Sequence, residues 1–285
     1  MTSIYTYAMG SVRNATITGF LLTTMDLKES YVDLSFDRDN VFCSLNAVYL
    51  ETNNKSKREI LDELNDDFLN IGIMFLENDN AYKTTRYKYP NVGIRFAEYD
   101  PESRFIKIYV SDKFISHFLN KDFEEITDAI MQISSHEDTH RQQVDRSNNK
   151  AKGLDPNNTL QTPSEWKEYY SNPTEIDAHA AEFARYLYNK DLKSGEIIHL
   201  INNQAKSLWD CPAYKQYWDM FGIITRCKDK LDKDGYERLY VWKRFLKRTI
   251  AYLQSTFKYH FGLDESRVLS NLNKLIESKK PTNEQ

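Results

Sequence analysis

The spacing of hydrophobic residues changes along the chain, and these changes indicate where helices and strands begin. In "SKREILDELNDDFLNIG" (56–72) apolar residues recur every three or four positions, which predicts an amphipathic helix. The run "YVDLSF" (31–36) upstream of it is β-like. Two further β-branched and aromatic runs, at 91–99 and 104–110, are separated by "DPES", in which the proline suits the second position of a type I turn. Together these two runs predict a β-hairpin over 91–110.

The second half of the chain has helical spacing almost throughout. The stretch 122–147 predicts one long amphipathic helix, because its apolar residues lie along one face and it contains no proline or glycine. Asparagine, glycine, proline and threonine dominate 148–163, which predicts a surface loop. Helices are predicted after this loop by the patterns "NPTEIDAHAAEFARYLYNK", "GEIIHLINNQAKSLW", "PAYKQYWDMFGIITRC" and "GYERLYVWKRFLKRTIAYLQSTFKYHFG".

These elements predict an α+β fold, in which a small β-sheet or hairpin packs on the long helix and a mainly helical C-terminal subdomain follows. We expect four segments: an N-terminal α+β part at 1–120 that contains the hairpin 91–110, two helices at 121–190 that carry the candidate chemistry, a helical subdomain at 191–275, and a disordered tail at 276–285.

Net charge and cysteine content indicate which binding partners and which cellular compartment to expect. The net charge is -4 at pH 7, so we expect neither nucleic acid nor a membrane as a partner. The first residues lack a signal-peptide pattern, and no later segment has the roughly 18 apolar residues of a transmembrane span. Three cysteines without a CxxC motif are typical of reduced thiols. The composition, with 9 glycines beside 19 tyrosines, is typical of an AT-rich viral or bacterial source. We therefore expect a cytoplasmic or virion-associated protein.

One short stretch, "SSHEDTHRQQ" (134–143), combines residues suited to metal binding and acid–base chemistry. On a helix, His136 and His140 project from one face about 6 Å apart along the axis, so both imidazoles can reach one zinc ion. Glu137 lies about 100° round the helix from His136, close enough to contact a metal-bound water without binding the metal itself. The alternative is that the stretch is the solvated face of an amphipathic helix. Both interpretations stay open on the motif alone.

The HExxH pattern formed by His136, Glu137 and His140 resembles the signature of zinc peptidases, the zincins. The resemblance implies that the two histidines are zinc ligands and that Glu137 is the general base. It also implies a zincin-like domain, in which the β-hairpin lies beside the helix that carries the motif. An exposed strand edge would then hold an extended peptide substrate.

A second motif, "YYSNPTEIDAHAAEFARY" (169–186), begins a helix with Asn172 as N-cap and Pro173 at the first helical position. In zincins of the gluzincin type, a glutamate on a downstream helix completes the ligand set, and Glu175 matches that place. The wording "NPTEIDA" is also similar to an NPxExxA segment of small phage or bacterial HExxH proteins. The resemblance therefore implies that Glu175 is the third zinc ligand.

Two other interpretations of this second helix stay open. Glu175 is also placed to complete a capping box, in which its carboxylate would accept a hydrogen bond from the Asn172 amide. His179 lies on the same helical stripe and is the main rival for the third ligand position. His179 also stands where many gluzincins have an aspartate that orients a ligand histidine, so that carboxylate is missing at its usual place.

Residues around the motif have weaker candidate roles. His179 could instead donate a hydrogen bond to the zinc-bound carboxylate, stabilise an oxyanion, or be an ordinary polar residue. Tyr170, just before the second helix, could supply a phenol to an oxyanion, with packing as the alternative. The remaining histidines are each surrounded by apolar or aromatic residues, so we expect buried or half-buried structural roles for His117, His199 and His260.

Two functions from different classes follow. The first is a zinc-dependent metalloendopeptidase that acts on a peptide or protein, with Zn²⁺ as its cofactor. The second is a non-catalytic structural or interaction protein, such as a virion or assembly component, on a zinc-binding zincin scaffold. Exposed aromatic residues in the helical C-terminal part would then form a docking surface for a protein partner; the candidates are Trp209, Tyr214, Tyr217 and Trp218.

Overall fold

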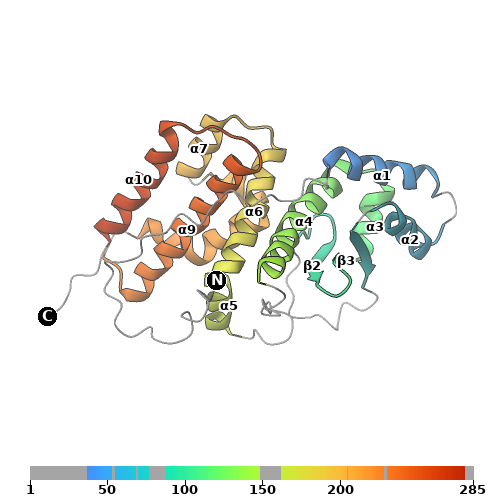
Figure 1. Ribbon diagram of the computed structural model, residues 1–285, viewed down its shortest axis with the longest axis horizontal. Helices are drawn as coiled ribbons and strands as arrows, with labels where there is room; N and C mark the ends of the chain where they lie inside the picture. Colours follow the sequence, from blue (N-terminus) through green and yellow to red (C-terminus); the bar gives the residue numbers. More distant parts are fainter. Residues whose placement is uncertain are drawn as a thin grey trace, which may run out of the picture.

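A small sheet with helices around it forms the first part of the molecule, and helices alone form the second (Figure 1). The computed structural model describes residues 37–279 except 53–54, 69, 77–87, 148–161, 204 and 228–229. The predicted β-like run at 31–36 therefore lies outside the described residues. The first part contains α1 (Arg38–Leu50), α2 (Lys57–Asp67), β1 (Ile71–Phe75), β2 (Ile94–Asp100), β3 (Phe105–Val110), α3 (Asp112–Leu119) and α4 (Phe123–Arg146).

The predicted loop at 148–163 lies, except for its last two residues, outside the described residues, and the second part follows it. The sheet of the first part and the helices of both parts confirm the coarse α+β class. The second part contains α5 (Pro163–Ser171), α6 (Pro173–Asn189), α7 (Ser194–Asn202), η2 (Lys206–Asp210), α8 (Pro212–Tyr217), η3 (Trp218–Gly222), η4 (Ile223–Arg226), α9 (Lys233–Ser255) and α10 (Leu263–Ser278). Helix α10 continues into the segment where a disordered tail is predicted, and its Ile276 is buried because it joins the helical core. Residues 280–285 lie outside the described part.

Several predicted boundaries differ from the structure. The helix predicted over 56–72 ends at Asp67, and Ile71 and Gly72 at the end of that range belong to strand β1 instead. The start of this helix is as predicted: Ser56 is the N-cap, and a capping box forms, in which the side chains of Ser56 and Glu59 each accept a hydrogen bond from the other residue's backbone amide. Helices α1, α3 and α5 are not among the predicted elements.

The predicted hairpin is confirmed as β2 and β3, which pair antiparallel, while β1 pairs with β3 in parallel. The order β1-β3-β2 leaves β2 at an edge of the described sheet. The register shifts between Ile94 and Phe96. Because this bulge changes which side chains face the core, Ile94 is buried whereas Phe96 is half-buried and stacks on Tyr109, with ring centroids 4.3 Å apart.

Two separate clusters of buried hydrophobic residues form the core. The first spans Val41 to Ile133 and packs the sheet against α1 to α4, and the second spans Tyr169 to Ile276 and packs the helices of the C-terminal part. Helices α4 and α6 lie side by side between the two clusters (Figure 1). The boundary between the cores therefore falls between the two helices that carry the sequence motifs.

The predicted aromatic docking surface is wrong for three of its four residues. Tyr214, Tyr217 and Trp218 are buried, and Trp209 is half-buried. Two of the buried rings lie between α6 and α9: Tyr214 lies 4.8 Å from the Phe183 ring, and Tyr217 stacks on Phe245 at 4.3 Å. Trp218 packs against Trp242 of α9. These aromatic residues stabilise the helical core, because their large apolar area is removed from water.

No described helix is both long enough and apolar enough to cross a membrane.

Candidate metal centre

The polar half of α4 is buried, which excludes the interpretation of "SSHEDTHRQQ" as a solvated face. His136 and Glu137 are 3 % and 5 % exposed, and Asp138 is fully buried. Only His140 and the residues after it reach partial exposure. Burial of this many polar groups on one helix is costly unless they have partners, so the stretch requires a polar neighbour. Helix α6 supplies that neighbour.

Helix α6 begins as its sequence predicts. Asn172 is the N-cap, its side chain accepts a hydrogen bond from the Thr174 amide, and Pro173 occupies the first turn. The capping-box interpretation of Glu175 is wrong, because the Asn172 amide donates to the Tyr169 carbonyl instead. The Glu175 carboxylate is buried, and its Oε1 atom lies 3.7 Å from Nε2 of His140.

The Nδ1 atoms of His136 and His140 both face oxygen acceptors. His140 Nδ1 lies 3.0 Å from Oε1 of Gln143, whose amide orientation is set because its Nε2 donates to the Thr174 carbonyl. His136 Nδ1 lies 3.0 Å from Oε2 of Glu182, at ion-pair distance but without the angle of a hydrogen bond. In a neutral imidazole, an oxygen beside Nδ1 favours the proton on that nitrogen, and Nε2 then carries a lone pair.

These two lone pairs face each other, because the Nε2 atoms of His136 and His140 are 3.2 Å apart. Two unprotonated nitrogens repel at this distance unless a proton or a metal cation lies between them. Two nitrogen ligands at 2.0–2.1 Å from a tetrahedral zinc ion would be roughly 3.3–3.4 Å apart. The spacing of the two imidazoles therefore fits a shared zinc ion.

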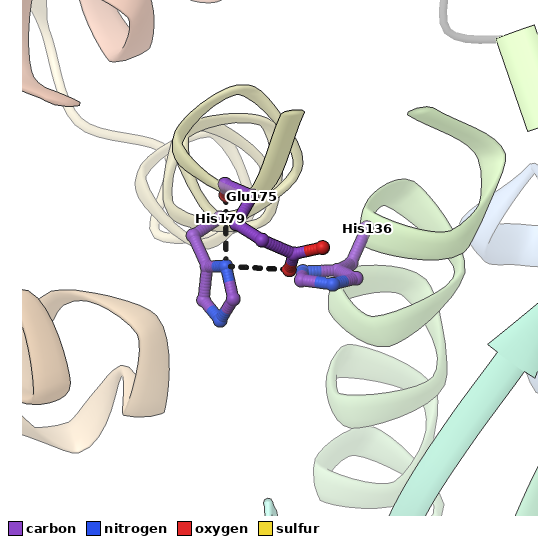
Figure 2. A group of neighbouring side chains, drawn as sticks. All are labelled: His136, Glu175 and His179. Atoms are coloured by element: carbon purple, nitrogen blue, oxygen red, sulfur yellow. Dashed lines mark hydrogen bonds and ion pairs between the residues drawn. The ribbon is translucent and has the colours of Figure 1, made fainter. Parts of the chain in front are cut away.

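Glu175 adds a carboxylate to this pair of imidazoles. Its Oε2 atom is buried and has no hydrogen-bond partner among the described residues. A buried carboxylate oxygen without a partner is unfavourable, and a metal ion would satisfy it. One donor atom from each of His136, Glu175 and His179 lies within 4.8 Å of the other two, a group that could hold a metal ion (Figure 2).

His179 has a defined hydrogen bond that restricts its role. Its Nδ1 donates to the Glu175 carbonyl oxygen at 2.9 Å (Figure 2). Burial holds the pKa of His179 well below its usual value, and the neighbouring His136 lowers it further, so the ring is neutral. A neutral imidazole with its proton on Nδ1 has none on Nε2, and it cannot donate to an oxyanion. The same tautomer leaves Nε2 able to bind a metal.

The two tyrosines before α6 take different positions. The ring of Tyr170 lies 5.2 Å from His179 and stacks on Trp166. Tyr169 is the one beside the candidate ligand: burial raises its pKa well above the usual value, and the charge and hydrogen bonding of the Glu175 carboxylate raise that pKa further. The phenol beside Glu175 is therefore that of Tyr169. The ring of Tyr170 packs against the rings of Trp166 and His179 instead.

A carboxylate that the sequence motif does not indicate lies at the back of the site. Glu182 is fully buried on α6, and its Oε2 contacts both His136 Nδ1 and Lys88 Nζ at 3.0 Å. Its Oε1 accepts a hydrogen bond of 2.7 Å from the Tyr89 hydroxyl. Glu182 follows Glu175 by seven residues on one helical stripe, and this spacing is the only sequence signal for it. Lys88 and Tyr89 precede β2 and have no such signal.

Burial and several nearby titratable groups shift the pKa of the Glu137 carboxyl group. Burial raises its pKa, His140 and Lys88 lower it, and the carboxylates of Glu175 and Glu182 raise it again. A raised pKa brings a carboxylate closer to the range in which it can both accept and return a proton near neutral pH.

The remaining histidines lie outside this cluster. His117 is half-buried, as predicted, and its Nδ1 lies 2.7 Å from Oδ2 of Asp122. His199 and His260 are exposed, so the prediction of burial is wrong for both, because each lies on the solvent side of an otherwise apolar segment. The three cysteines are free thiols, in agreement with the prediction.

No protein-family model, curated protein or solved structure matches this chain. The chemistry of the site therefore rests on the chain's own residues.

Proposed function

We propose that this chain is a zinc metallopeptidase in which His136, His140 and Glu175 hold the metal. One observation carries the proposal: the Nε2 atoms of His136 and His140 face each other at 3.2 Å, beside the buried Glu175 carboxylate. Two imidazoles and one carboxylate are a ligand set of catalytic zinc sites, in which a fourth position stays open.

Glu137 is the general base in this proposal. Zinc in such a site acts as a Lewis acid that activates a water molecule and polarises a carbonyl group. The Glu137 carboxylate takes a proton from the attacking water and passes it to the nitrogen of the leaving amine. Its burial, and the raised pKa that follows, support this use of the side chain. The result is hydrolysis of an amide bond.

The zincin-like fold belongs to the same proposal. Its support is the order of elements: hairpin β2–β3, the motif helix α4, and the Glu175 helix α6. Strand β2 lies at the sheet edge and contacts α4. An extended peptide can add to such an edge through main-chain hydrogen bonds. Among the described residues, the segment just before β2 pairs with its beginning, through Tyr89 and Ile94 and through the Lys88 amide and the Arg95 carbonyl.

Metal content and cleavage test this proposal together. We expect protein purified without added metal to contain about one zinc per chain and to cleave members of a peptide library. Glu137→Gln should retain the zinc and lose cleavage by roughly 10²–10⁴-fold, because only the proton transfer is removed. His140→Ala should lose most of the metal, whereas His199→Ala, which changes an exposed histidine, should behave like wild type. A wild-type protein without stoichiometric zinc contradicts the proposal.

His179 supports a second candidate function, a zinc-binding scaffold without catalysis. The ring lies close to His136, with centroids 4.3 Å apart, and its Nε2 carries a lone pair. With His179 as a fourth protein donor, the zinc would have four ligands and no open position, as in structural sites. The near-complete burial of His136, Glu175 and His179 also agrees with a closed site.

Cobalt substitution separates the two functions. In a peptidase with an open position, His179→Ala should leave the visible absorption spectrum of the cobalt-substituted protein nearly unchanged, because His179 is not a ligand. In a closed scaffold, the same variant should change the spectrum and lower the metal affinity. Zinc retention without cleavage across the peptide library, together with that spectral change, would favour the scaffold.

A further inference from the structure

Lys88 and His136, both from the first part of the molecule, contact the same carboxylate oxygen of Glu182 on α6. Lys88 Nζ and His136 Nδ1 each lie 3.0 Å from Oε2 of Glu182, and Glu182 is fully buried. The other oxygen, Oε1, is held by the Tyr89 hydroxyl at 2.7 Å. The carboxylate is therefore fixed in place, and its negative charge is divided between an imidazole and an ammonium group.

These two contacts act on the metal site with opposite sign. A carboxylate beside Nδ1 makes an imidazole more electron-rich, so its Nε2 binds a metal ion more strongly. An ammonium group on the same oxygen draws part of that charge away, and its own positive charge repels a dication nearby. Lys88 has a side chain only 19 % exposed, so water screens this effect incompletely.

We propose that Glu182 and Lys88 set the metal affinity of the site in opposite directions, with Glu182 strengthening His136 as a ligand and Lys88 opposing it. Both are positioning residues, since neither contacts the metal position directly. The inference rests on the proposed zinc site. A metal ion held in this balanced way stays electron-poor, which favours polarisation of a substrate carbonyl.

Zinc dissociation constants, measured by competition with a chromophoric chelator, test the opposite signs. Glu182→Gln should weaken zinc binding by roughly 10–100-fold, because His136 loses its carboxylate. Lys88→Met should bind zinc more tightly than wild type, and Lys88→Arg, which keeps the charge, should stay close to wild type. A role limited to packing would weaken binding in both Glu182→Gln and Lys88→Met.

Two control substitutions make the same changes of charge at residues that do not contact Glu182. Lys113→Met removes an ammonium group that donates to the Pro90 carbonyl, and Glu98→Gln changes a carboxylate that accepts from Tyr109. Both should leave the zinc dissociation constant near that of wild type. If circular dichroism shows that Glu182→Gln does not fold, the zinc affinity of Lys88→Met alone tests the inference.

The outcomes separate this inference from the proposed function. A wild type that binds no zinc contradicts the proposed function itself. A wild type that binds zinc, with Lys88→Met weaker than wild type or equal to it, overturns only the opposing roles of Lys88 and Glu182.

Discussion

At the scale of single residues, the site is defined by buried histidines that stay neutral. Burial lowers the pKa of His136 and His179 well below the usual value of 6.5, and the charge of Lys88 lowers both pKa values further. A neutral imidazole has one donor nitrogen and one acceptor nitrogen, and here the donors face oxygen atoms. The acceptor nitrogens are then available for a metal ion.

These pKa shifts predict that the metal-free protein loses stability in mild acid. Below about pH 6.5 the unfolded chain protonates both histidines while the folded chain does not, so the unfolded state binds more protons. The free energy of unfolding should therefore fall as the pH falls, by up to about 1.4 kcal/mol per pH unit for each histidine. Urea unfolding of zinc-free protein between neutral pH and about pH 5.5 measures this slope.

Two comparisons make the acid prediction specific. In the His179→Gln variant, which has one such histidine fewer, the slope should fall by about half. The raised pKa of Glu137 acts in the opposite direction as the pH approaches 5, because the folded chain then takes up that proton first. A slope that His179→Gln leaves unchanged would show that other groups control the acid sensitivity.

At the scale of elements, one turn places the half-buried Lys88 and the buried Tyr89 beside the site. The chain turns back on itself between Tyr89 and Ile94, whose amides donate to each other's carbonyls. Gly93 lies in this turn at φ +75°, and a Cβ added there would lie 2.4 Å from the Phe114 amide nitrogen. Glycine is required for both the backbone angle and the close approach of α3.

Gly93→Ala should destabilise the protein by about 1–3 kcal/mol, since the alanine is strained and its methyl group displaces α3. Chemical denaturation gives this value directly. Gly72→Ala is the matched control: a Cβ on Gly72 in β1 meets no atom within 4 Å, so its effect should stay within about 0.5 kcal/mol. Equal effects of the two substitutions would contradict the steric explanation.

The elements that were predictable from sequence are those set by local interactions. The helix that carries His136 and the cap at Asn172 follow from apolar spacing and from residues a few positions apart. The first two residues of β1, Ile71 and Gly72, fall within the predicted helix, because "IGI" alone does not distinguish a buried strand from the end of a helix. Pairing with β3, a neighbour distant in sequence, decides that these residues are extended.

At the scale of the whole molecule, the candidate metal centre lies where two hydrophobic cores meet. His136 and His140 come from α4, which packs in the first core, and Glu175 comes from α6, which packs in the second. A metal ion held by both helices links the two cores. Asp128 of α4 adds a peripheral link, since its carboxylate accepts a hydrogen bond from Asn189 of α6 and also pairs with Arg38 of α1.

We therefore predict that metal removal lowers both the stability and the cooperativity of unfolding. A bound ligand stabilises the folded state by about 2.7 kcal/mol at a free concentration of 100 times its dissociation constant. With zinc, calorimetry should show one transition at a higher Tm; with a chelator, the transition should broaden or divide as the cores unfold separately. His140→Ala should resemble the chelated wild type under both conditions, and identical scans with and without zinc would contradict a metal link.

The sequence by itself determined the α+β class, the hairpin, the motif helix and the capped start of α6, because spacing, turn residues and caps act over a few neighbouring positions. The pattern His136-Glu137-xx-His140 likewise needed only a helix to bring its imidazoles onto one face. The exclusion of the solvated-face interpretation required tertiary structure, since burial of α4 depends on what packs against it.

Tertiary structure alone decided how the site is surrounded. Lys88 and Glu182 are 94 positions apart in sequence order and meet only because the turn before β2 packs across the boundary between α4 and α6. The contact of His136 Nδ1 with Glu182 likewise joins α4 to α6, two helices that pack in different cores. No local pattern encodes these two contacts of Glu182, because their partners are distant in sequence.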